Sequence, residues 1–254
     1  MNKIVSTLLQ RRAHKRESKG SKGRNSAKNK KSQEVRAFNN LLSCLAECLT
    51  LARRMGSSFD IDGGIRALEK GRTLALEAGY PLLETPMLHE MIQFIVWLDY
   101  PQSLQYLTLR AIELNREIFG NGSTGLFLHL VTHIESLMHT KKKHSCEKFI
   151  QEALPIAIEK QAFHHELLFR HLLVEIYDKQ KKFALSKEHQ ERIEFIDNLL
   201  LDGDAETMND EIQRLEDMSF VEFEREYNRQ FGLDEDDASA SLLLAGVTLT
   251  QSLR

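Results

Sequence analysis

The sequence predicts an all-α protein built from antiparallel helical hairpins. Only four prolines occur in 254 residues, and alternating runs of β-branched residues, which are typical of strands, are nearly absent. Between about residues 37 and 201, apolar-periodic stretches of 15–20 residues alternate with short turns, which indicates antiparallel neighbours. In the second helix of each pair, small or apolar residues recur seven positions apart on one face, at Ala67/Leu74, Leu104/Ala111, Cys146/Ala153 and Ser186/Ile193.

The first helical pair follows a basic tail. Residues 11–33 contain no large apolar side chain, so residues 1–35 are expected to form a disordered tail. The first helix is expected over residues 35–55, and the loop Gly56–Asp60 ends it. Asp62 is the expected N-cap of the second helix, which Gly79 closes and Pro81 prevents from continuing.

Three further pairs complete an expected helical domain over residues 36–200. The second pair covers residues 83–99 and 101–120, with Pro101 in the first turn and Gly120 as the C-cap. The third pair covers residues 126–140 and 146–160, and the fourth covers residues 165–179 and 183–200.

The aligned second helices are 37, 42 and 40 residues apart, and the fourth pair resembles the tetratricopeptide-repeat (TPR) family. In the segment LLVEIYDKQKKFALSKEHQERI, the residues that match the family pattern are Leu173, Tyr177, Phe183 and Ser186. The segment Ala111–Asn115 (AIELN) also resembles the end of a repeat, whereas Val174 replaces the small residue of the first helix. The resemblance covers about residues 37–200.

This resemblance implies a superhelix that holds a partner segment in a concave groove lined by the first helix of each pair. The polar positions expected to be exposed on those helices, and therefore to bind the partner, are Gln93, His129, His133, Arg170 and Glu175.

Beyond the expected array, residues 201–237 are predicted to form an acidic, amphipathic helical extension, and residues 238–254 a short apolar segment. One face of the extension carries Phe220, Phe223, Tyr227 and Phe231. This face is expected to cap the exposed end of the last helical pair, and the alternative is that it binds a partner.

Charge is distributed unevenly along the chain. Residues 1–36 contain twelve Lys and Arg and two Glu, whereas residues 202–237 contain fourteen acids and three Arg. The basic segment is either a solvated tail, a contact for nucleic acid or another polyanion, or a partner of the acidic region. A mitochondrial presequence is a further alternative. The residues expected to contact a polyanion are Arg11, Arg12, Lys15, Arg16, Lys19, Lys22, Arg24, Lys28, Lys30 and Lys31.

No motif in the sequence predicts catalysis, a cofactor or a metal. His129 and His133 have a helix spacing that suits a metal, but Leu130 stands where a zinc protease has its general base, so both are interpreted as structural. The acidic stretches that begin at Asp60 and Asp202 lack the closing glutamate of a calcium loop. The sequence also contains no GxGxxG, P-loop or GxSxG motif.

These observations predict a cytoplasmic protein that is not an enzyme. The three cysteines form no CxxC pair, and no apolar run reaches the roughly 20 residues of a membrane helix. The expected function is an interaction scaffold, adaptor or chaperone-like protein with a protein or peptide partner. The alternative is a nucleic-acid-associated protein that uses the basic tail.

Overall fold

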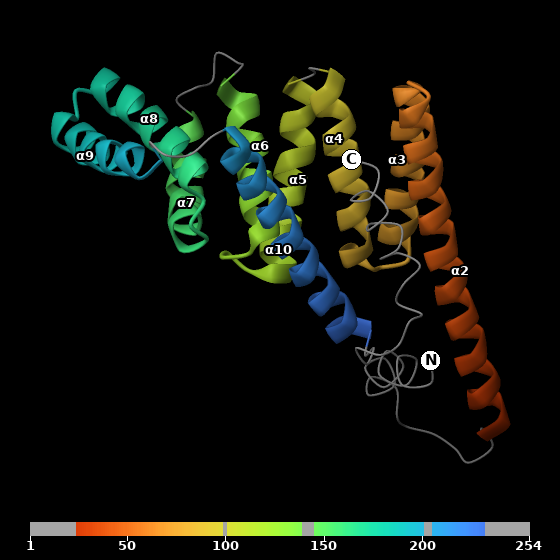
Figure 1. Cartoon of the computed structure of the whole chain (residues 1–254). Helices are drawn as coiled ribbons and strands as arrows, with labels where there is room; N and C mark the ends of the chain where they lie inside the picture. Colours follow the sequence, from red (N-terminus) through yellow and green to blue (C-terminus); the bar gives the residue numbers. More distant parts are fainter. Residues whose placement is uncertain (1–23, 99–100, 139–144, 201–204, 232–254) are drawn as a thin grey trace. The chain divides into compact units, whose positions relative to one another are not determined.

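The computed structural model describes residues 24–98, 101–138, 145–200 and 205–231. Within these ranges the chain forms nine α-helices and one short 3-10 helix, with no strand (Figure 1), so the predicted all-α class is confirmed. The helices are α2 (Arg24–Ser57), α3 (Ile61–Glu77), η1 (Pro81–Glu84), α4 (Thr85–Leu98), α5 (Pro101–Phe119), α6 (Thr124–Met138), α7 (Cys146–Glu159), α8 (Phe163–Lys179), α9 (Phe183–Leu200) and α10 (Ala205–Phe231).

The chain divides into two compact units. The first unit combines residues 1–94 with residues 224–254, and the second comprises residues 95–223. The division falls inside α4 and α10, whereas the sequence predicted one helical domain over residues 36–200 and a separate acidic extension. The superhelical arrangement of the hairpins stays a prediction.

Helix α2 begins eleven residues before the expected start at Val35. Residues 24–34 were expected to be disordered, and the structure corrects this expectation because they belong to the helix. Seven of these eleven residues are Lys, Arg, Ala, Gln or Glu, which favour helix, so the absence of large apolar residues does not prevent helical structure. Residues 1–23 of the expected tail lie outside the described ranges.

In the first unit, α2 and α3 pack side by side (Figure 1). A Cβ atom at Gly71 of α3 would lie 3.1 Å from the Cβ of Cys48 on α2, so glycine permits the close approach.

Two ion pairs join α2 and α3 to the segment formed by η1 and α4. Arg72 Nε donates to Glu84 Oε1 at 2.6 Å, and Arg53 Nε donates to Glu90 Oε1 at 2.9 Å.

The turns that end α2, α3, α7 and α8 share one hydrogen-bond pattern. In each turn a backbone N–H bonds to the carbonyl five residues earlier, as in the bond from Ala162 to Ala157. The preceding residue has a positive φ, even where it is Phe59, Gln161 or Lys181 instead of glycine.

At the start of α3, the Asp60 carboxylate accepts from the N–H of Gly63. The N-cap is therefore Asp60, and the prediction of Asp62 was wrong.

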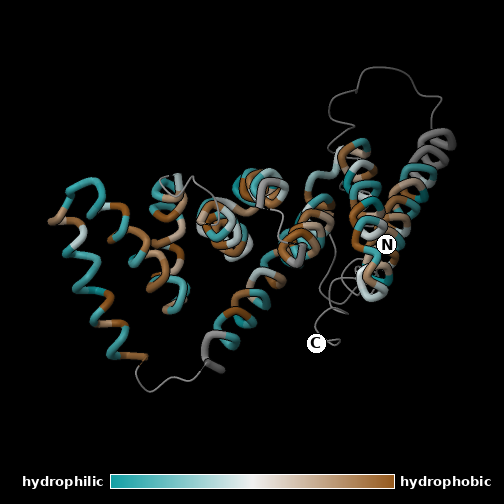
Figure 2. The backbone as a smooth tube through the Cα atoms, turned by 90° about the horizontal axis from the view of Figure 1, so that it is seen from above, coloured by the Kyte–Doolittle hydropathy of each residue, from teal (hydrophilic) through white to brown (hydrophobic). Residues whose placement is uncertain are grey.

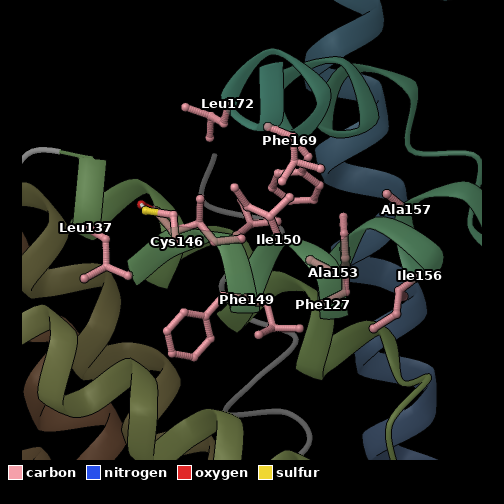
Figure 3. Close-up of a cluster of buried hydrophobic side chains, with 14 of the residues drawn as sticks. Phe127, Leu137, Cys146, Phe149, Ile150, Ala153, Ile156, Ala157, Phe169 and Leu172 are labelled. Carbon is pink, nitrogen blue, oxygen red and sulfur yellow. Dashed lines mark hydrogen bonds between the residues drawn. The ribbon is translucent and has the colours of Figure 1, made fainter. Parts of the chain in front are cut away.

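The second unit contains a hydrophobic core formed mainly by α6, α7 and α8, part of which Figure 3 shows. Helices that are consecutive from α5 to α9 pack as neighbours. Seven of the eight residues in the predicted pairs seven positions apart are buried, and the eighth, Leu74, is half-buried. Phe127 of α6 also contacts α8, with its ring centroid 5.5 Å from the ring of His165 and 6.2 Å from that of Phe169.

Helix α6 is central in this unit and α9 is peripheral. Eleven of the fifteen residues of α6 are buried, but only three of the eighteen residues of α9 are buried. Figure 2 shows α9, the helix that leads into the grey segment before α10, as mostly hydrophilic. No helix among the described residues is long and apolar enough to span a membrane.

Candidate partner-binding surface

The two histidines predicted to line a groove lie in the core of the second unit. His129 and His133, on α6, are 6% and 2% exposed, so the expectation that they are exposed is corrected. The reason is that α6 packs between α5 and α7, which leaves little of its surface for solvent.

His133 has partners inside the protein. Its Nδ1 lies 2.8 Å from the hydroxyl oxygen of Thr108 on α5, and its ring meets the ring of Phe149 edge-on at 4.4 Å. Burial, with a smaller effect from the charge of Lys148, lowers the pKa of His133 to about 4. His133 is therefore neutral at physiological pH. In the part of the chain that the structure describes, no three His, Cys, Asp or Glu side chains group to hold a metal ion.

Arg170 belongs to an ion-pair network between α8 and α9. Its Nε donates to Glu166 Oε1 at 2.8 Å, and Arg192 Nε donates to the same oxygen at 3.1 Å. A further contact of 3.1 Å joins Arg170 Nη1 to Nδ1 of His189, whose pKa is lowered by burial and then by the charge of Arg170. Arg170 was expected to be exposed, but it is buried and engaged in this network.

The other two predicted groove residues are more accessible. Gln93 is half-buried in the first unit. Glu175 is exposed on α8 in the second unit, where Lys179 Nζ donates to its carboxylate at 2.6 Å. The second unit therefore does not bring His129, His133, Arg170 and Glu175 together on one open surface.

Instead, the starts of α6 and α8 bind carboxylates from the acidic helix α10. At α8, the backbone N–H groups of His164 and His165 donate to Glu211 at 3.2 and 3.4 Å. The ring Nδ1 atoms of the same two histidines lie 3.2 and 2.6 Å from the Glu211 oxygens. Ala162, at the N-cap of α8, has no side chain that can cap the helix, so Glu211 supplies the acceptor from a distant part of the sequence.

The electrostatics favour a charged carboxylate at this position. Burial raises the pKa of Glu211, but hydrogen bonds from His165 and His164 outweigh burial, and the net pKa lies below the ordinary value. An ionised carboxylate only accepts hydrogen bonds, so Nδ1 of each histidine carries the hydrogen. The positive end of the α8 dipole adds to the attraction.

Glu222 makes the equivalent contact at the start of α6. It accepts from the backbone N–H of Thr124 at 2.8 Å and from the Thr124 hydroxyl at 2.8 Å. Its carboxylate also lies 3.5 Å from the N–H of Gly125. Ser123 supplies the local cap, because its hydroxyl accepts from the N–H of Leu126 at 3.2 Å.

Between these carboxylates, α10 reaches the turn between α7 and α8. The guanidinium of Arg214 donates to the backbone carbonyls of Lys160 and Gln161 at 2.9 and 3.2 Å. A cation is favourable at the C-terminus of α7, where helix carbonyls lack intrahelical partners. The next residue of α10, Leu215, is fully buried in the core cluster. We call the bound groups of His164, His165, Thr124, Gly125 and the turn Lys160–Gln161 the α6–α8 surface.

The aromatic residues of α10 do not form the expected single cap on the last helical pair. Phe223 is buried in the second unit, and Phe220 is half-buried. Tyr227 and Phe231 belong to the first unit, where the Phe231 ring lies 5.1 Å from that of Phe38. The aromatic residues therefore divide between the two units, and α9 keeps exposed apolar residues at Phe183, Leu185, Phe195 and Leu199.

Glu211, Arg214 and Glu222 were not predicted as site residues. Glu211 lies near the start of α10, where acids are typical of a solvated first turn. A signal was nevertheless present. Glu211, Leu215, Met218 and Glu222 follow the spacing i, i+4, i+7 and i+11, which places two acids on the same face as apolar residues.

Most of the residues expected to bind a polyanion cannot be placed. Those from Arg11 to Lys22 lie outside the described residues, whereas Arg24, Lys28, Lys30 and Lys31 belong to the first turns of α2.

Comparison with known proteins adds no family. No protein-family model matches the chain, and no curated protein gives a significant match. The resemblance to the TPR family therefore stays a prediction.

Proposed function

We propose that this protein is a non-enzymatic interaction scaffold, an adaptor or a chaperone-like protein, whose second unit binds a helical partner segment across the starts of α6 and α8. The observation that carries the proposal is that this surface already binds a helix, α10, through Glu211, Arg214 and Glu222.

The contacts in this unit have the features of a recognition surface. Helix N-termini attract carboxylates through their free N–H groups and their dipole, and the turn carbonyls attract a cation. Glu211 and Glu222 are eleven residues apart, which corresponds to about 16 Å along a helix. One helix therefore spans both N-termini, and the surface can distinguish ligands by charge and by spacing.

The proposal is tested by capture experiments with the full chain. Immobilised wild type is compared with Glu211→Ala/Glu222→Ala, which frees the surface, and with Asp210→Ala/Asp217→Ala, a control that changes two exposed acids of the same helix. We expect the first variant to retain more of a specific protein from lysate, with nuclease present, than wild type or the control. Equal protein capture by all three chains would contradict the proposal.

One observation favours the alternative of a nucleic-acid-associated protein. Helix α2 has 34 residues and α3 has 17, so the basic first half of α2 extends past its partner (Figure 1). Lys and Arg on such a helix would neutralise phosphates without reading sequence. The test is binding of a labelled polyanion to the full chain and to a chain that lacks residues 1–33. Binding that falls steeply with salt and disappears on deletion would support this alternative, and unchanged binding would contradict it.

A further inference from the structure

We propose that the partner of the α6–α8 surface is an acidic amphipathic helix with two carboxylates eleven residues apart, and that it competes with α10 for this surface. The inference rests on the proposed function and specifies the chemistry of the ligand.

The first argument is the chemistry of the two helix N-termini, those of α6 and α8. Each one presents backbone N–H groups at the start of a helix, and at α8 the ring of the buried His165 adds a donor 2.6 Å from the bound carboxylate. At α6 the added donor is the hydroxyl of Thr124, a buried residue. Both helix N-termini therefore fit an anion with two oxygens, such as the side-chain carboxylate of Glu.

The second argument is direction. The carbonyls of Lys160 and Gln161 bind a guanidinium three residues after the first carboxylate. A helix docked in the opposite direction would have to place its cation elsewhere, so the surface distinguishes the two directions. The pattern that fits is Glu-x2-Arg-x7-Glu, with an apolar residue directly after the arginine, where α10 has Leu215.

The third argument is that α10 has few apolar anchors in this unit. From Asn209 to Phe223, the only buried residues are Glu211, Leu215 and Phe223. Polar and charged contacts therefore make a large part of the attachment. A helix in another protein with the same charges and two apolar anchors would make equivalent contacts, and it could displace α10 at sufficient concentration.

The test uses a fluorescent synthetic peptide of residues 205–231 as the probe. The receptor is the full chain carrying Glu211→Gln/Glu222→Gln, which weakens the attachment of its own α10. We expect the peptide to bind this chain at least about tenfold more tightly than wild type, because in wild type the covalently linked α10 competes at high effective concentration. The same peptide with both glutamates replaced by glutamine should bind the variant chain about tenfold more weakly, and one with Asp210→Asn/Asp217→Asn should bind it as the original does.

The inference is overturned if the original peptide does not bind the folded variant chain, or if the glutamine peptide binds equally well. Circular dichroism shows whether the variant chain keeps its helices. If the variant does not fold, amide hydrogen exchange of wild type decides. Millimolar peptide should then accelerate exchange in residues 209–223 while the N–H groups of Thr124 and His164 stay protected, and unchanged exchange in residues 209–223 would overturn the inference.

The outcomes separate this inference from the proposed function. If Glu211→Ala/Glu222→Ala captures a specific protein that excess α10 peptide does not compete away, the scaffold function holds and the acidic-helix partner is wrong. If neither capture nor peptide binding occurs, both proposals fail.

Discussion

Replacing Glu222 by alanine should destabilise the second unit by removing an acceptor that the start of α6 needs. The carboxylate accepts from the N–H and the hydroxyl of Thr124, both at 2.8 Å. Because Thr124 is fully buried, water does not readily replace the lost carboxylate as an acceptor. Loss of a helix cap costs about 1 kcal/mol, and loss of a hydrogen bond to a charged group costs about 1.5–3 kcal/mol. The Glu222 side chain is 24% exposed, so we take about 2 kcal/mol as the expected decrease in the free energy of unfolding.

The assay is thermal unfolding followed by circular dichroism. For a unit of this size, 1 kcal/mol corresponds to roughly 2–4 °C in Tm, so Glu222→Ala should lower the Tm by about 4–8 °C. The matched control is Asp210→Ala, an exposed acid on the same helix, which should change the free energy of unfolding by less than about 0.5 kcal/mol. Equal Tm values for Glu222→Ala and Asp210→Ala would refute the reasoning that the carboxylate caps α6.

Three further predictions concern the interior. The pKa of His133 falls from 6.5 to about 4 on folding, so between these pH values the unfolded chain binds a proton that the folded chain does not bind. The free energy of unfolding should therefore decrease by about 3 kcal/mol as the pH falls from 6.5 to 4. In His133→Gln, urea titrations should show a decrease in the free energy of unfolding over the same pH range that is smaller by about 3 kcal/mol than in wild type. An equal decrease in the two chains would contradict the assigned pKa. Arg72→Ala removes one ion-pair partner of the fully buried Glu84 and should cost about 1.5–3 kcal/mol in urea titrations, whereas Arg66→Ala, at an exposed position of the same helix, should cost little. Equal effects of the two substitutions would argue against the ion pair. Phe223→Ala should cost about 3–5 kcal/mol in thermal melts, and a loss no larger than that of Val221→Ala, at an exposed position, would show that Phe223 is not packed.

Local sequence signals predicted much of the fold. Proline and glycine positions gave the start of α5 at Pro101 and its end before Gly120, because both residues act through their own backbone geometry. The periodicity of apolar residues likewise predicted eight helices over residues 36–200, and the structure confirms them among the residues that it describes there. The start of α2 was missed because large apolar residues were treated as necessary for helix, although Lys, Arg and Ala favour helix by themselves.

The candidate surface could not be predicted in the same way, because it depends on contacts between distant segments. Glu222 and Thr124 are 98 residues apart, and Glu211 and His164 are 47 residues apart. Their pairing depends on where α10 lies against the second unit, which no local pattern determines. The same limit explains His133. A histidine on the polar side of an isolated helix is expected to be exposed, but neighbouring helices bury α6 on several sides.

The central claim is that Glu211 and Glu222 hold α10 on the α6–α8 surface. Residue-resolved amide hydrogen exchange tests it most directly, because the first N–H groups of a helix have no intrahelical acceptor and exchange rapidly unless another group binds them. In wild type, the N–H groups of Thr124 and His164 should be protected, and in Glu211→Ala/Glu222→Ala this protection should be lost. The N–H of Gly63, which the Asp60 carboxylate binds in the other unit, should exchange at the same rate in both chains. Equal exchange of Thr124 and His164 in the two chains would contradict the account.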